Sequence, residues 1–489
     1  TASGHGLVVA NPHFPWGGEA RFWECHLTLP GEMDAYGVSL IGAPNIQIGF
    51  NRDVAWTHTF SRGQRFAVYR LDLDPADPTR YRYGDDERAM APTTHTVEVL
   101  DEHGVLAPVT RTLWHTHYGP MLNLPLVGWS TQMGFTYRDA NADNDRFLTQ
   151  VAALNTATGM DDFQAAMAEH QGLPWVNALA ADDTGRCWYI DVSTTPKLSD
   201  AAQASFEQAL TDDVFTAMLY DMRVVLLDGS DPTFEWVDDP DAPSAGVTPY
   251  AELPQLERDD YVFNSNDPYW LPHVEAQLPR HQTMCGLFRR PVTPRTRMNA
   301  RICAEGRDWT VASAVGALLD NRSLLADLLC DDIIERLRRH EQACAPGPPS
   351  VEADAELVNL TGLADLLASW DRRFDLDSVG AVAFRELLAS FTAAELADAG
   401  ILFARGFDPD DPVGTPCELA PPPEGAADPV LVAAGRALRA LEAAGSSPDA
   451  PLGTVQYAER GGRRVPLHGG VETEGIAHLI PPNGSLPPA

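Results

Sequence analysis

The stretch GLVVANPHFPW, residues 6–16, organises the rest of the chain. Its three apolar residues Leu7–Val9 predict a short buried strand. Pro12 then ends the strand, because the residue before a proline is pushed out of the helical region. His13 follows at once, with the aromatic Phe14 beside it. A histidine in this position is well placed to line a pocket, although on this stretch alone a core histidine with a satisfied hydrogen bond is the simpler interpretation.

Composition indicates a folded globular protein. The chain has 489 residues, 44% of them hydrophobic, and 11 tryptophans, so it can bury one very large core or two to three ordinary ones. The net charge of −34 argues against a nucleic-acid partner or an anionic membrane surface, since either would be repelled. No apolar run approaches the ~20 residues of a membrane helix. We therefore expect a soluble protein with neither kind of partner.

The cysteines and histidines do not form a recognisable metal motif. Seven cysteines are widely spread, without a CxxC pair or zinc spacing. Cys330 and Cys344 flank one helical segment, where a disulfide and two free thiols are equally compatible with the sequence. The pair His115 and His117 would share one strand face, which zinc can use, as could His26 and His58 on other strand-like segments, but no acid stands at a diagnostic spacing. We expect no metal and no cofactor.

The pattern of apolar residues predicts a mixed α+β protein. Short strands between Gly, Pro, Asn and Asp breaks run from residue 6 to about 151, which favours a large antiparallel sheet. Helices are predicted at 161–170, 200–223 and 309–342, the last broken near Asn321, and residues 305–450 form a mainly helical portion. Further strands are predicted at 173–188 and 262–266. APGPPS at 345–350 is read as a linker.

Serine-hydrolase chemistry of the usual kind finds no support in the sequence. A GxSxG nucleophile elbow is absent. A Ser-His-Asp triad needs no local spacing, so it stays an open alternative without a motif to recommend it.

Six segments in order along the chain resemble one known family. Beside NPHFPW stand IGFNRDVAWTHTF (48–60), PWVNALAADDTGR (174–186), YVFNSNDPYW (261–270), TPRTR (293–297) and VPLHGG (465–470). Together they resemble the beta subunit of the penicillin-amidase family of N-terminal-nucleophile hydrolases, especially its acyl-homoserine-lactone acylases and aculeacin-type lipopeptide acylases. The resemblance runs nearly the whole length of the chain. It implies a four-layer αββα fold with stacked antiparallel sheets.

The resemblance also implies a mechanism. In this family a precursor cuts itself, and the serine at the new N-terminus becomes the nucleophile, with its own α-amino group as the base. An α-amine titrates near ~8 and can accept a proton at neutral pH. The two products stay together, so the implied partner is an alpha subunit from the same precursor. The implied location is secreted or periplasmic.

Four residues of this chain match the family's catalytic positions. His13 matches the histidine that steadies the nucleophile and its amine. Phe60 matches the position whose backbone N–H points into the oxyanion hole, and Asn266 matches the side-chain donor of that hole. Arg295 matches the arginine that holds this asparagine. The simpler readings, turn residues at Asn264 and Asn266 and a surface charge at Arg295, are outweighed by the six motifs together.

The chain departs from the family pattern at its start. Thr1 stands only twelve residues before His13, closer than the family nucleophile. We therefore expect the nucleophile about ten positions upstream of Thr1, outside this sequence. The whole of 1–489 is then an incomplete beta-subunit-type domain, a piece of a longer product that lacks the alpha subunit and a C-terminal tail and is inactive alone.

Three further positions match the acyl pocket of the family. Phe14 and Trp175 match aromatic lining residues, and Val151 stands where a relative carries a large aromatic, so a deeper pocket for a longer acyl chain is implied. We expect an acylase that removes an apolar acyl chain from an N-acyl homoserine lactone or an acylated cyclic peptide. The alternatives are a beta-lactam acylase of the same family, an inactive relative that binds acyl chains, and a histidine metallohydrolase.

Overall fold

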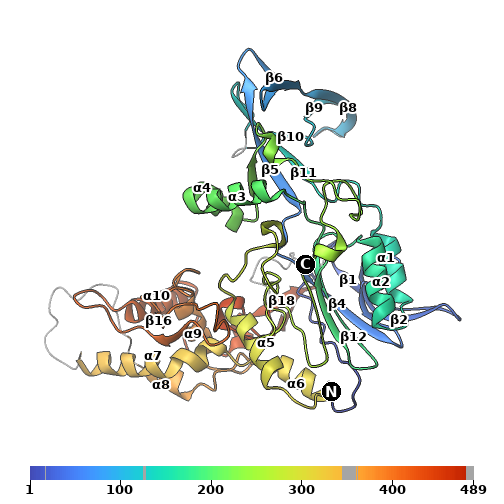
Figure 1. The fold of residues 1–489 in the computed structure, drawn as a ribbon. Coiled ribbons are helices and arrows are strands. Elements are labelled where there is room, and N and C mark those ends of the chain that lie inside the picture. Colours follow the sequence, from blue (N-terminus) through green and yellow to red (C-terminus); the bar gives the residue numbers. More distant parts are fainter. Residues whose placement is uncertain (17, 125–127, 344–359, 361, 481–489) are drawn as a thin grey trace.

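The computed structural model describes residues 1–16, 18–124, 128–343, 360 and 362–480 (Figure 1). Its largest sheet is antiparallel throughout, with seven strands in the order β1-β2-β3-β4-β12-β13-β15. The strands are β1 (Phe22–Leu29), β2 (Met33–Leu40), β3 (Ile48–Phe50), β4 (Val54–Phe60), β12 (Val176–Asp182), β13 (Cys187–Asp191) and β15 (Gln255–Arg258). The predicted large antiparallel sheet is therefore confirmed, and its central pair, β4 and β12, leads to the candidate site.

Helices α1 (Phe147–Asn155) and α2 (Met160–His170) cover one face of this sheet (Figure 1). Trp56 of β4 and Trp188 of β13 both contact Phe163 of α2, with ring centroids 5.9 and 6.4 Å apart. All three rings are buried, and each removes a large apolar area from water. This packing fixes the position of β4 relative to α2.

The opposite face is covered by the loops of residues 261–288 and by α5 (Pro294–Glu305). Leu179 and Tyr189 of the sheet pack there with Phe263 and Trp270 of the loops. Helix α5 begins where Thr293 caps it by accepting from the Thr296 N–H at 3.2 Å. The start of α5 is thereby placed next to the loop that carries Asn266.

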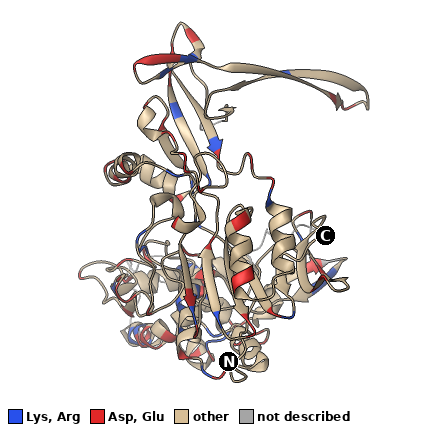
Figure 2. Cartoon of the chain, turned by 45° about the vertical axis from the view of Figure 1, so that its right-hand side comes forward, with Lys and Arg blue, Asp and Glu red and all other residues tan. Residues whose placement is uncertain are grey.

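A second sheet and a long ribbon extend away from the first. The second sheet runs β10-β11-β5-β6-β7, and β14 pairs in parallel with β5. Helices α3 and α4 pack near its β14 side, and the ribbon of β8 and β9 projects from the body (Figure 2). The elements are β5 (Phe66–Asp74), β6 (Asp77–Tyr83), β7 (Asp86–Ala89), β8 (Ala91–Leu100), β9 (Leu106–His115), β10 (Met121–Leu122), β11 (Met133–Asp139), α3 (Asp200–Asp212), α4 (Val214–Asp221) and β14 (Val225–Asp228).

The C-terminal part has its own apolar core. Helices α7, α8, α9 and α10 supply most of it, around residues such as Leu329, Phe384 and Ala434. The elements are α6 (Val311–Leu318), α7 (Leu324–Ala343), α8 (Leu363–Ser369), α9 (Ala381–Leu388), β16 (Phe403–Arg405), β17 (Cys417–Leu419), α10 (Pro429–Ala443), α11 (Leu452–Val455), β18 (Tyr457–Arg460) and β19 (Arg463–Pro466). The predicted break near Asn321 falls between α6 and α7, where Asn321 takes a φ of 54°.

Three sequence predictions need correction. Leu7–Val9 is not a buried strand, because it pairs with no described strand and Val9 is 50% exposed. Residues 262–266 form a loop, since Asn266 takes a left-handed φ of 71° and Phe263 is buried by packing and not by a strand ladder. The helix predicted at 200–223 is two helices, because Asp213 ends α3 and caps α4.

Two other predictions fall on residues outside the described ranges. They are the linker at 345–350 and the Cys330–Cys344 disulfide, since Cys344 is not described. The six described cysteines are free.

Candidate active site

A large cavity of about 1230 Å³ opens beside β4 and β12. Six of the seven site residues taken from the sequence line it, although they come from segments far apart in the chain. They are His13, Phe14, Phe60, Trp175, Asn266 and Arg295. The seventh, Val151, is not among the lining residues: it is 1% exposed in the core between the sheet and helices α1 and α2. Phe147, one turn earlier on α1, lines the cavity instead.

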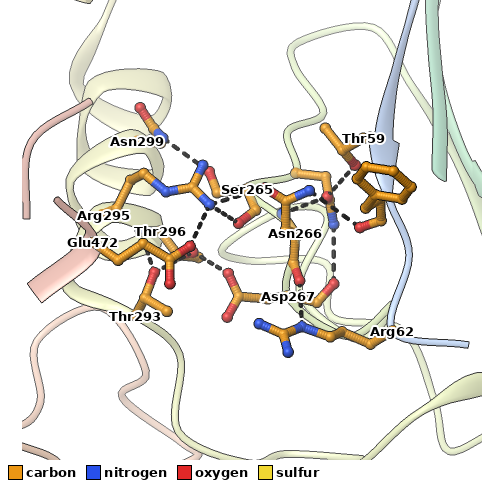
Figure 3. Close-up of polar contacts among 12 residues, drawn as sticks. Thr59, Arg62, Ser265, Asn266, Asp267, Thr293, Arg295, Thr296, Asn299 and Glu472 are labelled. Carbon is orange, nitrogen blue, oxygen red and sulfur yellow. Dashed lines mark hydrogen bonds and ion pairs between the residues drawn. The ribbon is translucent and has the colours of Figure 1, made fainter. Parts of the chain in front are cut away.

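The side-chain amide of Asn266 is held in one orientation. Arg295 Nη2 donates to Asn266 Oδ1 at 2.9 Å (Figure 3). A guanidinium can only donate, so the contacted atom must be the amide oxygen. The amide nitrogen then points the other way and donates to the Phe60 carbonyl at 3.2 Å. Its second N–H remains for a ligand in the cavity.

The backbone N–H of Phe60 points away from the neighbouring strand β12. Ser61 N donates to Trp175 O at 3.1 Å, and Phe60 lies opposite Val176. Hydrogen-bonded and non-bonded pairs alternate along an antiparallel ladder, so the Phe60 N–H faces the opposite edge of β4. Strand β3 pairs there only as far as Trp56. The Phe60 N–H is thus unused by the sheet.

A second layer of hydrogen bonds fixes the Asn266 loop to the sheet. Asn264 Oδ1 accepts from the Asn266 N–H at 2.8 Å, from the Thr59 hydroxyl and from Asn177 Nδ2 at 3.3 Å. Tyr189 donates its buried hydroxyl to Asn177 Oδ1 at 2.7 Å. The left-handed backbone of Asn266 is tolerated because asparagine adopts this region more readily than most residues.

Arg295 joins this loop to the C-terminal part of the chain. Its Nη2 atom also donates to Ser265 O at 2.6 Å and to Glu472 Oε1 at 2.9 Å (Figure 3). The Arg295 side chain is only 4% exposed. Removing one partner of such a buried charge leaves the other uncompensated, which is costly. Loss of Glu472 would therefore leave the buried Arg295 uncompensated, whereas the Glu472 side chain is 41% exposed and can be solvated.

Next to Asn266 lies a buried carboxyl group, that of Asp267. It accepts a hydrogen bond from the Thr296 hydroxyl in the first turn of α5. Burial raises the pKa of Asp267 to about 6, although Thr296 and the positive charge of Arg295 act against the rise. The Asp267 carboxyl therefore changes from neutral to negatively charged as the pH rises through a mildly acidic range.

His13 reaches the cavity as a neutral imidazole. Burial, together with the positive charge of Arg295 and the neighbouring His478, lowers the pKa of His13 to about 3. Its Nε2 is buried and has no hydrogen-bond partner among the described residues. Asn11, two residues earlier, contacts His478 Nδ1 at 3.3 Å and ties this segment to the C-terminal part. A neutral, unpaired nitrogen in the cavity that Phe60 and Asn266 also line can accept or relay a hydrogen bond.

One part of the cavity wall is aromatic. The ring of Phe14 stacks on Phe60 at 5.5 Å and tilts against Phe22 at 4.9 Å. Trp175 lies on the same wall, 37% exposed, with the Arg65 guanidinium 4.3 Å from its ring. An apolar chain can bind against such a surface, because the aromatic rings present no polar group that would be left without a hydrogen-bond partner.

The histidines considered as metal ligands lie apart. His26 pairs with Asp34, and His117 with Tyr81 and Glu235. Within the described ranges, no group of three or more His, Cys, Asp or Glu could hold a metal ion. His58 lines the cavity, and burial lowers its pKa to about 4.

Sequence reasoning missed several residues that support the site. Glu472 lies in VETEG, a segment with no motif of its own, so only the fold brings it to Arg295. Thr59 and Asn264 lie inside the quoted motifs WTHTF and NSND, and their polar side chains in strand-like surroundings were a usable signal. Asn177 lies in the quoted motif PWVN, where its polar side chain in strand-like surroundings was the same kind of signal.

The chain is similar to known proteins along nearly its whole length. The penicillin amidase family model matches residues 1–482. The chain is 33% identical over 484 residues to the acyl-homoserine lactone acylase PvdQ of Pseudomonas fluorescens, covering 98% of this chain and 58% of that protein. It is 36% identical over 495 residues to the aculeacin-A acylase of Actinoplanes utahensis, with the same two coverages.

The fold is also similar to a solved structure. The thermostable penicillin G acylase from Alcaligenes faecalis superposes with a TM-score of 0.57 at 14% identity, over 97% of this chain and 81% of that one. The fold is that of the N-terminal-nucleophile hydrolases, and the predicted α+β class with stacked antiparallel sheets is confirmed. The chain belongs to the penicillin amidase family. It spans 58% of the length of the two curated relatives described above.

Proposed function

We propose that the protein containing this chain is an acylase that hydrolyses a linear amide and releases an apolar acyl group as the acid. The observation that carries the proposal is a pair of neutral donors at one cavity: the unused N–H of Phe60 and the Asn266 amide fixed by Arg295. Two such donors suit the oxygen that becomes negative during acyl transfer. The names of the relatives, acylases of homoserine lactones and of aculeacin A, support the same reaction class.

The proposed nucleophile is a serine upstream of Thr1, freed by self-cleavage of a precursor. Its α-amine takes the hydroxyl proton while the oxygen bonds to the amide carbon. The carbonyl oxygen gains the negative charge and is received by Phe60 N–H and Asn266 Nδ2. The C–N bond then breaks, and the leaving amine takes the proton from the α-ammonium group. Water repeats the sequence on the acyl-enzyme and releases the acid.

His13 and Arg295 take positioning roles in this proposal. His13 is neutral at working pH, since its pKa is about 3, so it orients the nucleophile by a hydrogen bond and adds no charge. Arg295 fixes the amide of Asn266. Phe14, Phe60 and Trp175 receive the acyl chain. The proposed partner is an alpha subunit of the same precursor, and the proposed location is secreted or periplasmic. No helix in the described ranges has the length and apolarity needed to cross a membrane.

The test uses the full-length precursor. Intact mass and N-terminal sequencing should give a beta chain that begins at a serine about ten residues before Thr1. The processed protein should hydrolyse N-acyl homoserine lactones with apolar chains. Processing to Thr1 itself, or no turnover of any acyl amide by the processed protein, would overturn the proposal in favour of an inactive relative that binds acyl chains.

A further inference from the structure

His58 is a polar residue of the cavity wall whose ring has no partner. It lies on β4, two positions before Phe60, and both residues line the cavity. Both imidazole nitrogens of His58 are buried, and neither has a hydrogen-bond partner within the described ranges. Buried polar groups in proteins nearly always have a partner, so an unpartnered imidazole at a cavity wall calls for an explanation.

The side chain of His58 lies on the same face of β4 as the aromatic part of the cavity wall. Side chains alternate between the two faces of a strand, so Trp56, His58 and Phe60 point to one side. The Phe60 ring stacks on Phe14 at 5.5 Å. The Trp56 ring packs on Phe163 of α2. An acyl chain that runs from Phe60 along this face reaches His58 after about 7 Å, the length of two strand residues.

Gln47 brings an amide donor next to His58. Strand β3 pairs Gly49 with Trp56, and the same register continued by two residues sets Gln47 opposite His58. Trp56 Nε1 donates to Gln47 O at 2.9 Å, which ties the two segments together at this point. Gln47 is buried and lines the cavity. Its Oε1 accepts from the Leu40 N–H at 3.0 Å, whereas its Nε2 has no hydrogen-bond partner in the described part of the chain.

The neutral imidazole of His58 leaves one acceptor open. Burial lowers the pKa of His58 to about 4, although the backbone carbonyls of Asn177 and Gln47 act against the fall. Carbonyl groups only accept, so they suit the N–H of a neutral imidazole and leave its second nitrogen as an acceptor. Ala178, opposite His58 on β12, has no polar side chain. The open groups are therefore one donor, Gln47 Nε2, and one acceptor, the second nitrogen of His58.

We infer that the acyl pocket has a polar position at Gln47 and His58 that binds a hydroxyl group carried by the acyl chain. A hydroxyl can accept one hydrogen bond and donate another, so it matches both open groups. A keto oxygen only accepts, and a methylene group leaves both buried groups unpaired. The inference rests on the proposed acylase function and goes beyond it, because it names a substituent on the acyl chain and the two residues that select it.

Matched acyl amides test this inference in the full-length processed enzyme. They share one amine and one chain length and carry a hydroxyl, a keto oxygen or no substituent, with the substituent moved from carbon to carbon along the chain. The measured quantity is the ratio of kcat/KM for each substituted amide to that for the unsubstituted one. We expect the hydroxyl ratio to exceed one over a short stretch of the chain and to fall below one elsewhere, where the hydroxyl is buried without a partner. The keto ratio at the favoured carbon should lie below the hydroxyl ratio.

Variants assign the preference to the two residues. His58→Phe keeps a ring but removes the acceptor, so the hydroxyl ratio at the favoured carbon should fall by ~10-fold while unsubstituted amides are still hydrolysed. His58→Gln keeps a side-chain acceptor and should retain part of the preference. Gln47→Met removes the donor and should lower the hydroxyl and keto ratios alike. His95→Phe, exposed on β8 and outside the cavity, is the matched control and should leave every ratio unchanged.

The outcomes distinguish the two proposals. Turnover of none of the amides contradicts the acylase function itself. Turnover of unsubstituted amides, with no carbon at which a hydroxyl raises kcat/KM, leaves the acylase function standing and overturns the hydroxyl inference. The wild-type series alone decides this point, even if His58→Phe fails to fold. A hydroxyl preference that persists unchanged in folded His58→Phe and Gln47→Met would also overturn the inference, because other groups would then bind the hydroxyl.

Discussion

The two walls of the cavity are built by different means. On the polar wall, Asn266 and Arg295 are each held by several hydrogen bonds to loops, a strand and the C-terminal part. On the apolar wall, the side chains of Phe14 and Trp175 are placed by ring contacts, with the Phe14 ring against Phe22 and Phe60 and the Arg65 guanidinium over Trp175. The polar wall fixes the positions of individual hydrogen-bonding atoms, whereas the apolar wall provides contact area for an apolar ligand.

This difference separates two kinds of dependence. A hydrogen-bond donor stabilises the developing negative charge only when it points at that oxygen, so its loss should lower the rate equally for all acyl chains. An aromatic ring contributes in proportion to the area it covers, so its change should act by degrees and mainly on the choice of acyl chain. The variants below test this separation.

The largest expected effect is that of Asn266→Ala on the polar wall. It removes one of the two proposed oxyanion donors and also leaves Arg295 without one of its acceptors. We expect kcat/KM to fall by ~10²–10³-fold for every acyl chain length, measured by steady-state turnover of a graded series of acyl amides. Asn123→Ala, an exposed asparagine, is the matched control.

An Asn266→Ala enzyme that keeps wild-type kcat would remove Asn266 from the oxyanion hole. A loss that depends on chain length would contradict the separation of the two walls.

A stability effect is expected from Asp267→Asn behind the polar wall. The folded-state pKa of Asp267 is about 6, above its ordinary 3.8, so the folded state binds the proton more tightly than the unfolded state. The wild type should therefore lose stability relative to Asp267→Asn as the pH rises from about 4 to about 6, and little more above that. Two pKa units correspond to up to about 3 kcal/mol. Urea unfolding of both proteins across this range measures the difference, and a constant difference would show that folding does not raise the pKa of Asp267.

The contrast between the walls also explains what could be read from the sequence. His13, Phe60, Asn266 and Arg295 were found because each lies in a short motif, and the structure brings all four to one cavity. Glu472 was missed because its contact with Arg295 joins positions 177 residues apart. A single sequence records no such long-range pairing.

The errors have physical causes as well. Val262 and Phe263 have the composition of a strand, yet the backbone around them bonds irregularly, with Phe263 N donating to Pro272 O. Burial alone therefore does not establish a strand ladder. Leu7–Val9 likewise reads as a strand but lies along the cavity.

A graded effect is expected from Phe14→Leu on the apolar wall. The ring loses its contacts with Phe60 and Phe22, and space opens where the acyl chain is proposed to lie. We expect the preferred acyl chain to lengthen, with changes of ~1–3 kcal/mol in relative kcat/KM per methylene. Competition between acyl chains of graded length measures this directly. Phe215→Leu, exposed on α4, is the control, and an equal loss for all lengths in Phe14→Leu would place Phe14 with the polar wall.

The smallest effect on the reaction is expected from Val151→Ala. The family resemblance assigns Val151 to the acyl pocket, but the residue is 1% exposed and packs in the core behind Phe147. Truncation should cost about 2 kcal/mol of folding stability, from two lost methyl groups and the space they leave. Chain-length preference should stay unchanged, whereas Phe147→Ala, on the cavity itself, should shift it. Urea unfolding measures the stability, and the graded series of acyl amides measures the chain-length preference. A Val151→Ala enzyme that keeps its stability but prefers longer acyl chains would show that Val151 lines the pocket. The apolar wall would then extend one turn further along α1.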